Sequence, residues 1–200
     1  MSETNPTRSA VIEMKDERRA MHEGYVFLDE KCLLLAGEIL RELAQHGLLQ
    51  RRFIALHDAA TVALQRAVAR HGLQGLQLYP PSDPGQAQPV LRKRSLMGVR
   101  LQDASWPDAA MAAAPAAFPS PEAEACRAAY RALLRAATEL AGVTGNLERL
   151  SQEYRRAVRR ARALQDVMLP ELDRTLYDSE SRLEELEQED AIWMRQGARG

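Results

Sequence analysis

Histidine, glutamate and cysteine are among the residue types in this chain of 200 residues that could hold a metal ion or attack a substrate. The same predicted helix contains all four histidines, His22, His46, His57 and His71. In that helix His22 and His71 would be about 73 Å apart. They therefore cannot meet at one metal ion. Glu42 and His46 are one helical turn apart, but a metal site in a helix bundle needs several facing helices, and the sequence predicts only two.

Motifs for nucleotide binding, redox chemistry or nucleophilic catalysis are missing from the sequence. It contains no Gly-rich phosphate loop ending in Gly-Lys-Ser/Thr, no Gly-x-Gly-x-x-Gly after a strand, no Cys-x-x-Cys and no His-Glu-x-x-His. The two cysteines, Cys32 and Cys126, fit a reducing compartment, and we expect both to be small residues packed between helices. The sequence therefore predicts no catalytic residue, no metal ligand and no cofactor.

Charge is unevenly distributed along the second half of the chain, although the formal net charge is only −1. Six arginines lie between Arg149 and Arg162, and nine acidic residues follow between Glu171 and Asp190. These zones could be solvated helix faces with internal ion pairs, or surfaces that contact different partners and set the register of assembly. Nucleic-acid binding is disfavoured because no aromatic residues interleave with the arginines and acids follow directly.

The elements that position these residues are predicted to be long helices. Aromatic residues make up only 5% of the chain, whereas Ala, Leu, Arg and Glu predominate. Apolar and small residues recur every three or four positions over residues 7–70 and from residue 120 onward. This spacing predicts helices, and a mean step of about 3.5 residues is typical of a left-handed supercoil. Eight of the ten prolines lie between Pro80 and Pro121, so the helices should be interrupted there.

Capping residues and one proline refine these two helices. Thr7 or Ser9 can cap the first helix, and Ser120 followed by Pro121 is typical of the start of the second. We expect Pro170 to kink the second helix without ending it.

The predicted fold class is all-α: a long antiparallel left-handed two-helix coiled coil with a small β-hairpin or irregular insertion at the turn. Its parts are expected to be a shaft helix over residues 1–71, a hairpin and connector over 72–119, a second shaft helix over 120–196 and a tail over 197–200. Residues at the helical spacing are expected to form the seam, namely Met21, Tyr25, Leu28, Leu35, Ile39, Leu147, Tyr154, Val158, Leu164, Met168 and Leu172.

Short strands are expected in the middle of the chain. Residues 76–79 (LQLY) and 96–101 (LMGVRL) could pair across the turn-rich segment 80–89, and residues 102–119 are expected to be an irregular connector. Gly24, Gly142 and Gly145 interrupt the helical patterns, which indicates a close approach between helices or, for residues 141–146, a compliant point in the helix.

Four segments of the chain carry a resemblance to a known family. They are NPTRSAVIEMK (residues 5–15), GYVFLDEK (24–31), LMGVRL (96–101) and YRRAVRRARALQDVMLPELDRTLYDSESRLEELEQED (154–190). The last is the most specific, because its double arginine, its Ala-Leu pair at 163–164 and Pro170 fall at the family's spacing. In these segments the chain resembles the D subunit of the V/A-type rotary ATPases, the central rotor stalk.

The resemblance implies a non-catalytic shaft that couples ATP hydrolysis or synthesis to proton or sodium transport. Its termini would lie in a hexamer of A and B subunits, its lower part would bind the small F subunit of the stalk, and its base would rest on a funnel-like, C/d-type membrane-docking subunit. No run of 18 or more apolar residues occurs and the start lacks the apolar stretch of a secretory signal, so we expect a cytoplasmic protein that is peripheral to the membrane, with no direct insertion.

Site residues are assigned from the resemblance and the charge pattern together. Met97, Gly98 and Val99 should lie in the hairpin, which the family likeness links to modulation of hydrolysis. A generic coiled-coil scaffold and a helical-bundle enzyme remain as alternatives. The residues expected to contact partners are Arg155, Arg156, Arg159, Arg160, Glu184, Glu185, Glu187 and Glu189.

Overall fold

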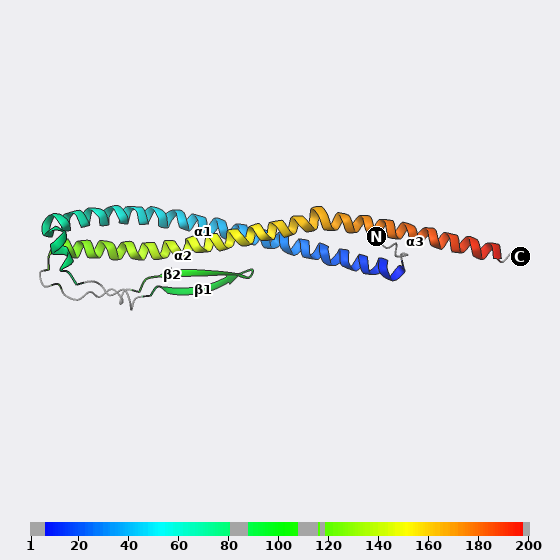
Figure 1. Cartoon of the computed structure of the whole chain (residues 1–200), viewed down its shortest axis with the longest axis horizontal. Coiled ribbons are helices and arrows are strands. Elements are labelled where there is room, and N and C mark those ends of the chain that lie inside the picture. Colours follow the sequence, from blue (N-terminus) through cyan, green and yellow to red (C-terminus); the bar gives the residue numbers. More distant parts are fainter. Residues whose placement is uncertain (1–6, 81–87, 108–115, 117–118, 198–200) are drawn as a thin grey trace. The chain divides into compact units, whose positions relative to one another are not determined.

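The computed structural model describes residues 7–80, 88–107, 116 and 119–197. These residues form two long helical segments with a two-stranded antiparallel sheet between them in the chain, which confirms the predicted fold class (Figure 1). The elements are α1 (Arg8–Gln77), β1 (Val90–Leu96), β2 (Val99–Ser105), α2 (Pro121–Ala163), the π-helix η3 (Leu164–Met168) and α3 (Leu169–Gly197).

The chain divides into two compact units. The terminal unit consists of Met1–Leu34 and Tyr154–Gly200, and the hairpin unit consists of Leu35–Glu153. Helix α1 contributes to both units, and so does α2.

Helix α1 begins at the first of the two predicted caps. The hydroxyl oxygen of Thr7 accepts a hydrogen bond from the backbone N–H of Ala10 at 3.3 Å, which satisfies one of the free N–H groups at the start of a helix. Near its other end, α1 is kinked at Gly72, where φ is 67° and ψ is 166°. This backbone conformation favours glycine because a Cβ atom would be strained at positive φ.

Helix α2 begins at the predicted Ser-Pro signal. The hydroxyl oxygen of Ser120 accepts a hydrogen bond from the N–H of Ala123 at 3.1 Å, and Pro121 occupies the first helical position. Nε2 of His71 lies 2.6 Å from the same Ser120 oxygen, and the hydroxyl of Tyr79 lies 3.5 Å from it. Ser120 therefore joins the end of α1 to the start of α2 in the hairpin unit.

The predicted pairing of residues 76–79 with 96–101 is wrong. Helix α1 continues to Gln77, and the strand that pairs with β2 is Val90–Leu96. The apolar run 96–101 is itself divided by the hairpin turn, because Met97 and Gly98 both have positive φ, at 47° and 83°. Two central residues with positive φ make a tight turn whose twist matches that of the flanking strands. The turn thus lies inside the predicted strand, and segment 80–89 precedes the hairpin.

Small side chains dominate the core of the hairpin unit. Leu35 and Leu150 are fully buried, and so are Ala67 and Ala136, with Ala60 almost so. Because alanine is short, two helices that meet at alanine positions can approach closely. The low aromatic content of the sequence is thus matched by a narrow core.

The terminal unit pairs the first part of α1 with the last part of the chain in antiparallel fashion. As residue numbers rise along α1, those of the ion-pair partners on α3 fall: Arg8 pairs with Glu187, and Lys15 pairs with Glu180. The small core of this unit includes Val11, which is buried.

A π-helical turn lies directly before Pro170. The backbone N–H of Leu169 donates to the carbonyl oxygen of Leu164, five residues earlier, instead of four. A proline ring lacks the N–H and crowds the carbonyl four residues before it, here that of Asp166. The wider turn gives that carbonyl room, and the chain stays helical through Pro170.

Candidate interaction surfaces and the docked hairpin

The β-hairpin is attached to α1 by a cluster of charged side chains. Nη1 of Arg94, on β1, donates to Oε1 of Glu38 at 2.6 Å, and Nη2 donates to Glu42. Arg41 donates to the second carboxylate oxygen of Glu38, and Nε of Arg94 lies 3.8 Å from Oδ1 of Asp103 on β2. The Glu38 and Glu42 side chains are each only 3% exposed. Arg94 therefore neutralises two buried carboxylates on the helix beneath it.

The ionisation of this cluster follows from its surroundings. Burial alone would raise the pKa of Glu38, but the hydrogen bonds and charges of Arg41 and Arg94 hold that pKa below its ordinary value. Burial would lower the pKa of Arg94, but its carboxylate partners raise that pKa above the ordinary value. Oε2 of Glu42 is buried and has no hydrogen-bond partner among the described residues. Glu38 is thus held ionised by Arg41 of its own helix together with Arg94 of the hairpin.

Strand β2 lies along α2 (Figure 1), where two positions receive it. Oδ1 of Asn146, a fully buried residue, accepts hydrogen bonds from the backbone N–H of Gln102 and from Nη2 of Arg149, both at 2.8 Å. One helical turn earlier, a Cβ on Gly142 would lie 3.0 Å from the backbone nitrogen of Ala104. A segment does approach closely at Gly142, but it is strand β2 of the hairpin and not, as we expected, a second helix.

The residues that hold the hairpin were absent from the sequence prediction. Glu38 and Glu42 continue the spacing of Leu35 along α1, so they lie on the buried face where the sequence pattern led us to expect apolar residues. Acidic residues at seam positions are a usable signal, because a carboxylate there requires a cation from elsewhere in the fold. Asn146, at a similarly buried position of α2, carries the same kind of signal.

The predicted seam residues are distributed over both units. Leu35 is fully buried, whereas Met168 is 42% exposed and lies in the π-helical turn. On α2 the fully buried positions are Ala136, Asn146 and Leu150, and the predicted seam residue Leu147 is half-buried. The remaining predicted seam residues are half-buried, namely Met21, Tyr25, Leu28, Ile39, Tyr154, Val158, Leu164 and Leu172.

An ionic ladder and a groove characterise the terminal unit. Lys15 and Glu180 are 2.7 Å apart, and Arg18 donates to Asp173. The bond to Asp173 raises the pKa of Arg18. An open groove of about 620 Å³ lies along this ladder, and its lining residues are Lys15, Arg18, Arg19, His22, Asp173, Leu176, Tyr177 and Glu180.

Within residues 7–80, 88–107, 116 and 119–197, no group of three or more His, Cys, Asp or Glu side chains is arranged to hold a metal ion. In the same part of the chain, none of the helices combines the length and the apolar character needed to cross a bilayer. Cys32 and Cys126 are free thiols, and burial raises the pKa of each.

Comparison with known proteins identifies the family of the chain. Residues 10–196 match the family described as the ATP synthase D subunit. This chain therefore belongs to the ATP synthase D-subunit family. It is 24% identical to the D subunit of the V-type ATP synthase of Thermotoga neapolitana, over 95% of this chain and 94% of that protein. It is 28% identical to the D subunit of the A-type ATP synthase of Pyrococcus abyssi, over 92% of this chain and 88% of that protein.

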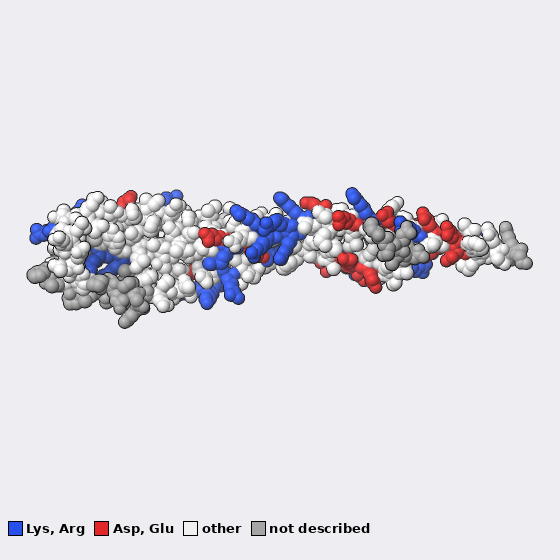
Figure 2. Space-filling model, viewed as in Figure 1, with Lys and Arg blue, Asp and Glu red and all other residues white. Residues whose placement is uncertain are grey.

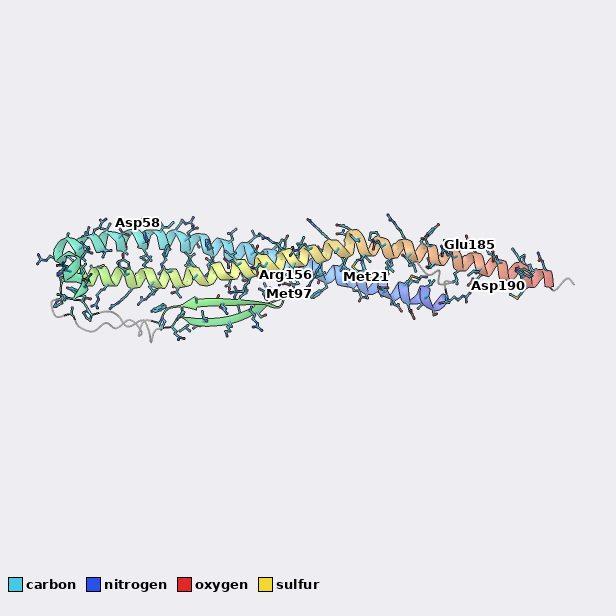
Figure 3. All side chains as sticks on the ribbon, in the orientation of Figure 1. Met21, Asp58, Met97, Arg156, Glu185 and Asp190 are labelled. Atoms are coloured by element: carbon cyan, nitrogen blue, oxygen red, sulfur yellow. The ribbon has the colours of Figure 1, made fainter. Side chains whose placement is uncertain are left out.

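The charged zones of this D-subunit family member lie mostly in the terminal unit. Lys and Arg gather on the last part of α2, and Asp and Glu gather on α3 (Figure 2). Arg156 is exposed on α2, and Glu185 is exposed on α3 (Figure 3). Glu187 accepts from Nη2 of Arg8 at 2.6 Å, so one predicted partner contact has a partner within the chain. The other residues predicted for partner contact are exposed, namely Arg155, Arg159, Arg160, Glu184 and Glu189.

The hairpin residues predicted from the family resemblance lie at the end of the hairpin. Met97 and Gly98 form the turn, and Val99 is the buried first residue of β2 (Figure 3). This family member thus carries a hairpin whose tip is defined by the turn and whose strands are fixed by Arg94 and Asn146.

Proposed function

We propose that this chain is the central stalk of a V/A-type rotary ATPase. In this role it transmits torque between the catalytic hexamer and the ion-translocating membrane ring, and so couples ATP hydrolysis or synthesis to proton or sodium transport. The observation that carries the proposal is the family match over residues 10–196, which spans both long helical segments and the hairpin.

The packing of the chain suits a part that bears load. Helices paired side by side in antiparallel fashion resist bending better than a single helix, and both units have this pairing. In the hairpin unit, Nη1 of Arg52 on α1 lies 3.3 Å from Oε2 of Glu139 on α2. In the terminal unit, Nζ of Lys15 on α1 lies 2.7 Å from Oε1 of Glu180 on α3. Contacts of this kind link the two helices at several points along α1, so each unit can turn as a body.

The proposed partners are other components of the same complex. The helical segments 1–71 and 120–196 would form the shaft, with the termini inside the hexamer of A and B subunits. The small F subunit of the stalk and a funnel-like membrane-docking subunit would bind farther along the shaft. The seam residues hold the shaft together in this proposal, and the exposed arginines and acids of the terminal unit are its outward contacts.

Catalysis and ion selection are assigned to those partners. Nucleotide would bind to the A and B subunits, and this chain would act mechanically, as a non-catalytic subunit. The complex would hold it on the cytoplasmic face of the membrane, as a peripheral component. Hairpin segment 72–119, which includes Met97 at its turn, would modulate the rate of hydrolysis.

The test is a pull-down of the tagged full-length chain from native membranes, followed by an ATPase assay on the eluate. We expect a nucleotide-hydrolysing hexamer to co-purify, and we expect the purified chain by itself to hydrolyse no ATP. Self-association without a hexamer would favour a coiled-coil scaffold and contradict the proposal. A bound metal or cofactor with activity in the isolated chain would contradict it as well.

A further inference from the structure

One edge of the hairpin is turned away from the helices. In an antiparallel pair, successive residues point their N–H and C=O groups alternately toward the partner strand and away from it. The N–H of Gln102 donates to Asn146 on α2, so it points away from β1. Its register partner Lys93 must then point its own N–H and C=O outward from the other side of the sheet. In Figure 1, β2 accordingly lies between α2 and β1.

The outer edge of β1 therefore offers main-chain groups from three alternate residues. Leu91 and Ser95 lie two residues on either side of Lys93, so their N–H and C=O groups also point outward. Their register partners on β2 are Ala104 and Arg100. Among the residues that the structure describes, no backbone hydrogen bond outside the hairpin satisfies these three. A row of free donors and acceptors at a sheet edge is a template for another strand.

The same edge is cationic. Arg92 and Lys93 on β1 are exposed, and so is Arg100 on the neighbouring β2; none of the three forms an ion pair with another described residue. The only acidic residue in segment 90–105 is Asp103, and it faces Arg94, which is already engaged with α1. Leu91 adds an apolar side chain that is 46% exposed. Positive charge and exposed apolar surface are thus combined along one strand.

The edge is held in place before any partner arrives. Arg94 ties β1 to Glu38 and Glu42 of α1, and Asn146 ties β2 to α2. The turn at Met97 and Gly98 fixes the register of the two strands. On binding, only the added strand would lose conformational entropy, because the hairpin is already ordered. Preorganisation of this kind increases affinity.

We propose that the outer edge of β1 binds an extended acidic segment of a partner protein by strand addition. Main-chain hydrogen bonds to Leu91, Lys93 and Ser95 would supply affinity, and the cations Arg92 and Lys93 would select acidic side chains. This goes beyond the stalk function, and its test does not require the assembled complex.

A second copy of this chain is excluded as the occupant by charge. Pairing β1 with another β1 would bring the arginine and lysine side chains of two strands together, and like charges on neighbouring strands destabilise a sheet. The same cations that prevent self-association would favour an acidic strand, so attraction and repulsion select the same partner.

The experiment titrates the full-length chain with a synthetic peptide of alternating glutamate and valine, by calorimetry at low salt. Lys93→Pro removes the outward N–H while leaving the bonds to β2 in place, because those come from the alternate residues. We expect affinity to fall about tenfold from the lost hydrogen bond and the bulk of the ring. Hydrogen exchange of β2 checks that the hairpin of the variant is intact.

A second variant tests the charge without touching the backbone. We expect the triple variant Arg92→Gln, Lys93→Gln, Arg100→Gln to bind about tenfold more weakly, and the wild-type affinity to fall with added salt. The matched control removes three exposed arginines of α1 in the same unit, Arg51→Gln, Arg66→Gln and Arg70→Gln, and should bind like the wild type.

Several results would overturn the proposal. Undiminished binding by Lys93→Pro with an intact hairpin would mean attraction of charge without strand addition. Equal binding of a lysine–valine peptide would remove the charge selectivity. Binding to anionic phosphatidylglycerol vesicles, with none to the acidic peptide, would make the edge a lipid contact and not a protein contact.

Discussion

Nη1 of Arg94 lies 2.6 Å from Oε1 of Glu38, although 56 residues separate them in the chain. The carboxylate is 3% exposed and the guanidinium 37% exposed, so the pair stands at the boundary between core and solvent. A buried charge tolerates only the geometry in which its partner is present. The position of the hairpin on α1 is therefore specified by this pair and not by apolar contact alone.

Replacing Arg94 with methionine should destabilise the hairpin unit. Methionine fills a similar volume but leaves Glu38 and Glu42 buried without their cation, which costs about 3 kcal/mol when a buried pair is broken. Urea denaturation should show this loss, and hydrogen exchange in β1 and β2 should accelerate. Adding Glu38→Gln and Glu42→Gln to the same variant should restore part of the stability. A single Arg94→Met variant as stable as the wild type would contradict the role of the cluster.

Stability should fall in acid because of Glu38. Its pKa in the folded chain is below the ordinary value, held there by Arg41 and Arg94 against the effect of burial. The unfolded chain therefore takes up this proton first as pH falls. The contribution is fully present above the ordinary pKa of about 4.3 and is lost as pH drops through the lower folded value.

The measurement is the free energy of unfolding of the wild type and of Glu38→Gln between neutral pH and pH 3. Glu38→Gln should show a shallower loss of stability below about pH 4.3. The groups that face this carboxylate, namely Arg41, Arg94 and the neighbouring Glu42, are unchanged in the variant. Parallel curves for the two proteins would show that Glu38 does not cause the acid sensitivity.

Two glycines on one helix should respond oppositely to alanine. A Cβ at position 142 would lie 3.0 Å from the backbone nitrogen of Ala104 and 3.1 Å from its Cβ, so Gly142→Ala should push β2 away and cost about 1–3 kcal/mol. A Cβ at position 145 would meet only the end of the Arg149 side chain, at 3.5 Å. Gly145→Ala should therefore gain up to about 1 kcal/mol from helix propensity. Thermal unfolding of both variants tests the pair, and equal effects would refute the distinction.

Much of the fold was predictable because its signals are local. Spacing and composition indicated the helices, and Thr7 and Ser120 marked helix starts. Gly142 indicated a close approach, although of a second helix and not of the strand that lies there. The prediction of the strands was wrong because segment 96–101 looks like one continuous strand when only hydrophobicity is considered. Nothing in that reading reveals that Met97 adopts positive φ, since methionine rarely does so and the neighbouring Gly98 carried the only hint.

The docking of the hairpin could not be predicted in the same way. Glu38 and Glu42 belong to α1, Arg94 to β1 and Asn146 to α2, so their meeting depends on packing of distant segments. A single sequence records the periodicity of each helix but not which strand lies across it. The presence of acids on a buried stripe shows that a cation is needed, without saying which one.

Ion pairs of the terminal unit should contribute little to the free energy of unfolding, but they should depend on the antiparallel register of the two helices. Lys15 and Glu180 are 2.7 Å apart with side chains 54% and 38% exposed. A double-mutant cycle with Lys15→Ala and Glu180→Ala should give a coupling below about 1 kcal/mol that shrinks in high salt. Swapping the two charges should recover the coupling, because the antiparallel register keeps the pair together. A coupling that is absent at low salt would argue against this register.

Reversing three exposed arginines of the terminal unit should weaken assembly of the complex. Arg156, Arg159 and Arg160 lie on the last turns of α2 and are exposed. Replacing all three with glutamate leaves helix propensity almost unchanged, so circular dichroism should stay at the wild-type level. A partner surface matched to positive charge would instead meet negative charge, which slows association and weakens the complex. The matched variant Arg51→Glu, Arg66→Glu, Arg70→Glu makes the same charge change in the hairpin unit. If the two triple variants co-purify equal amounts of the ATPase hexamer with unchanged helicity, the last turns of α2 are not a partner contact.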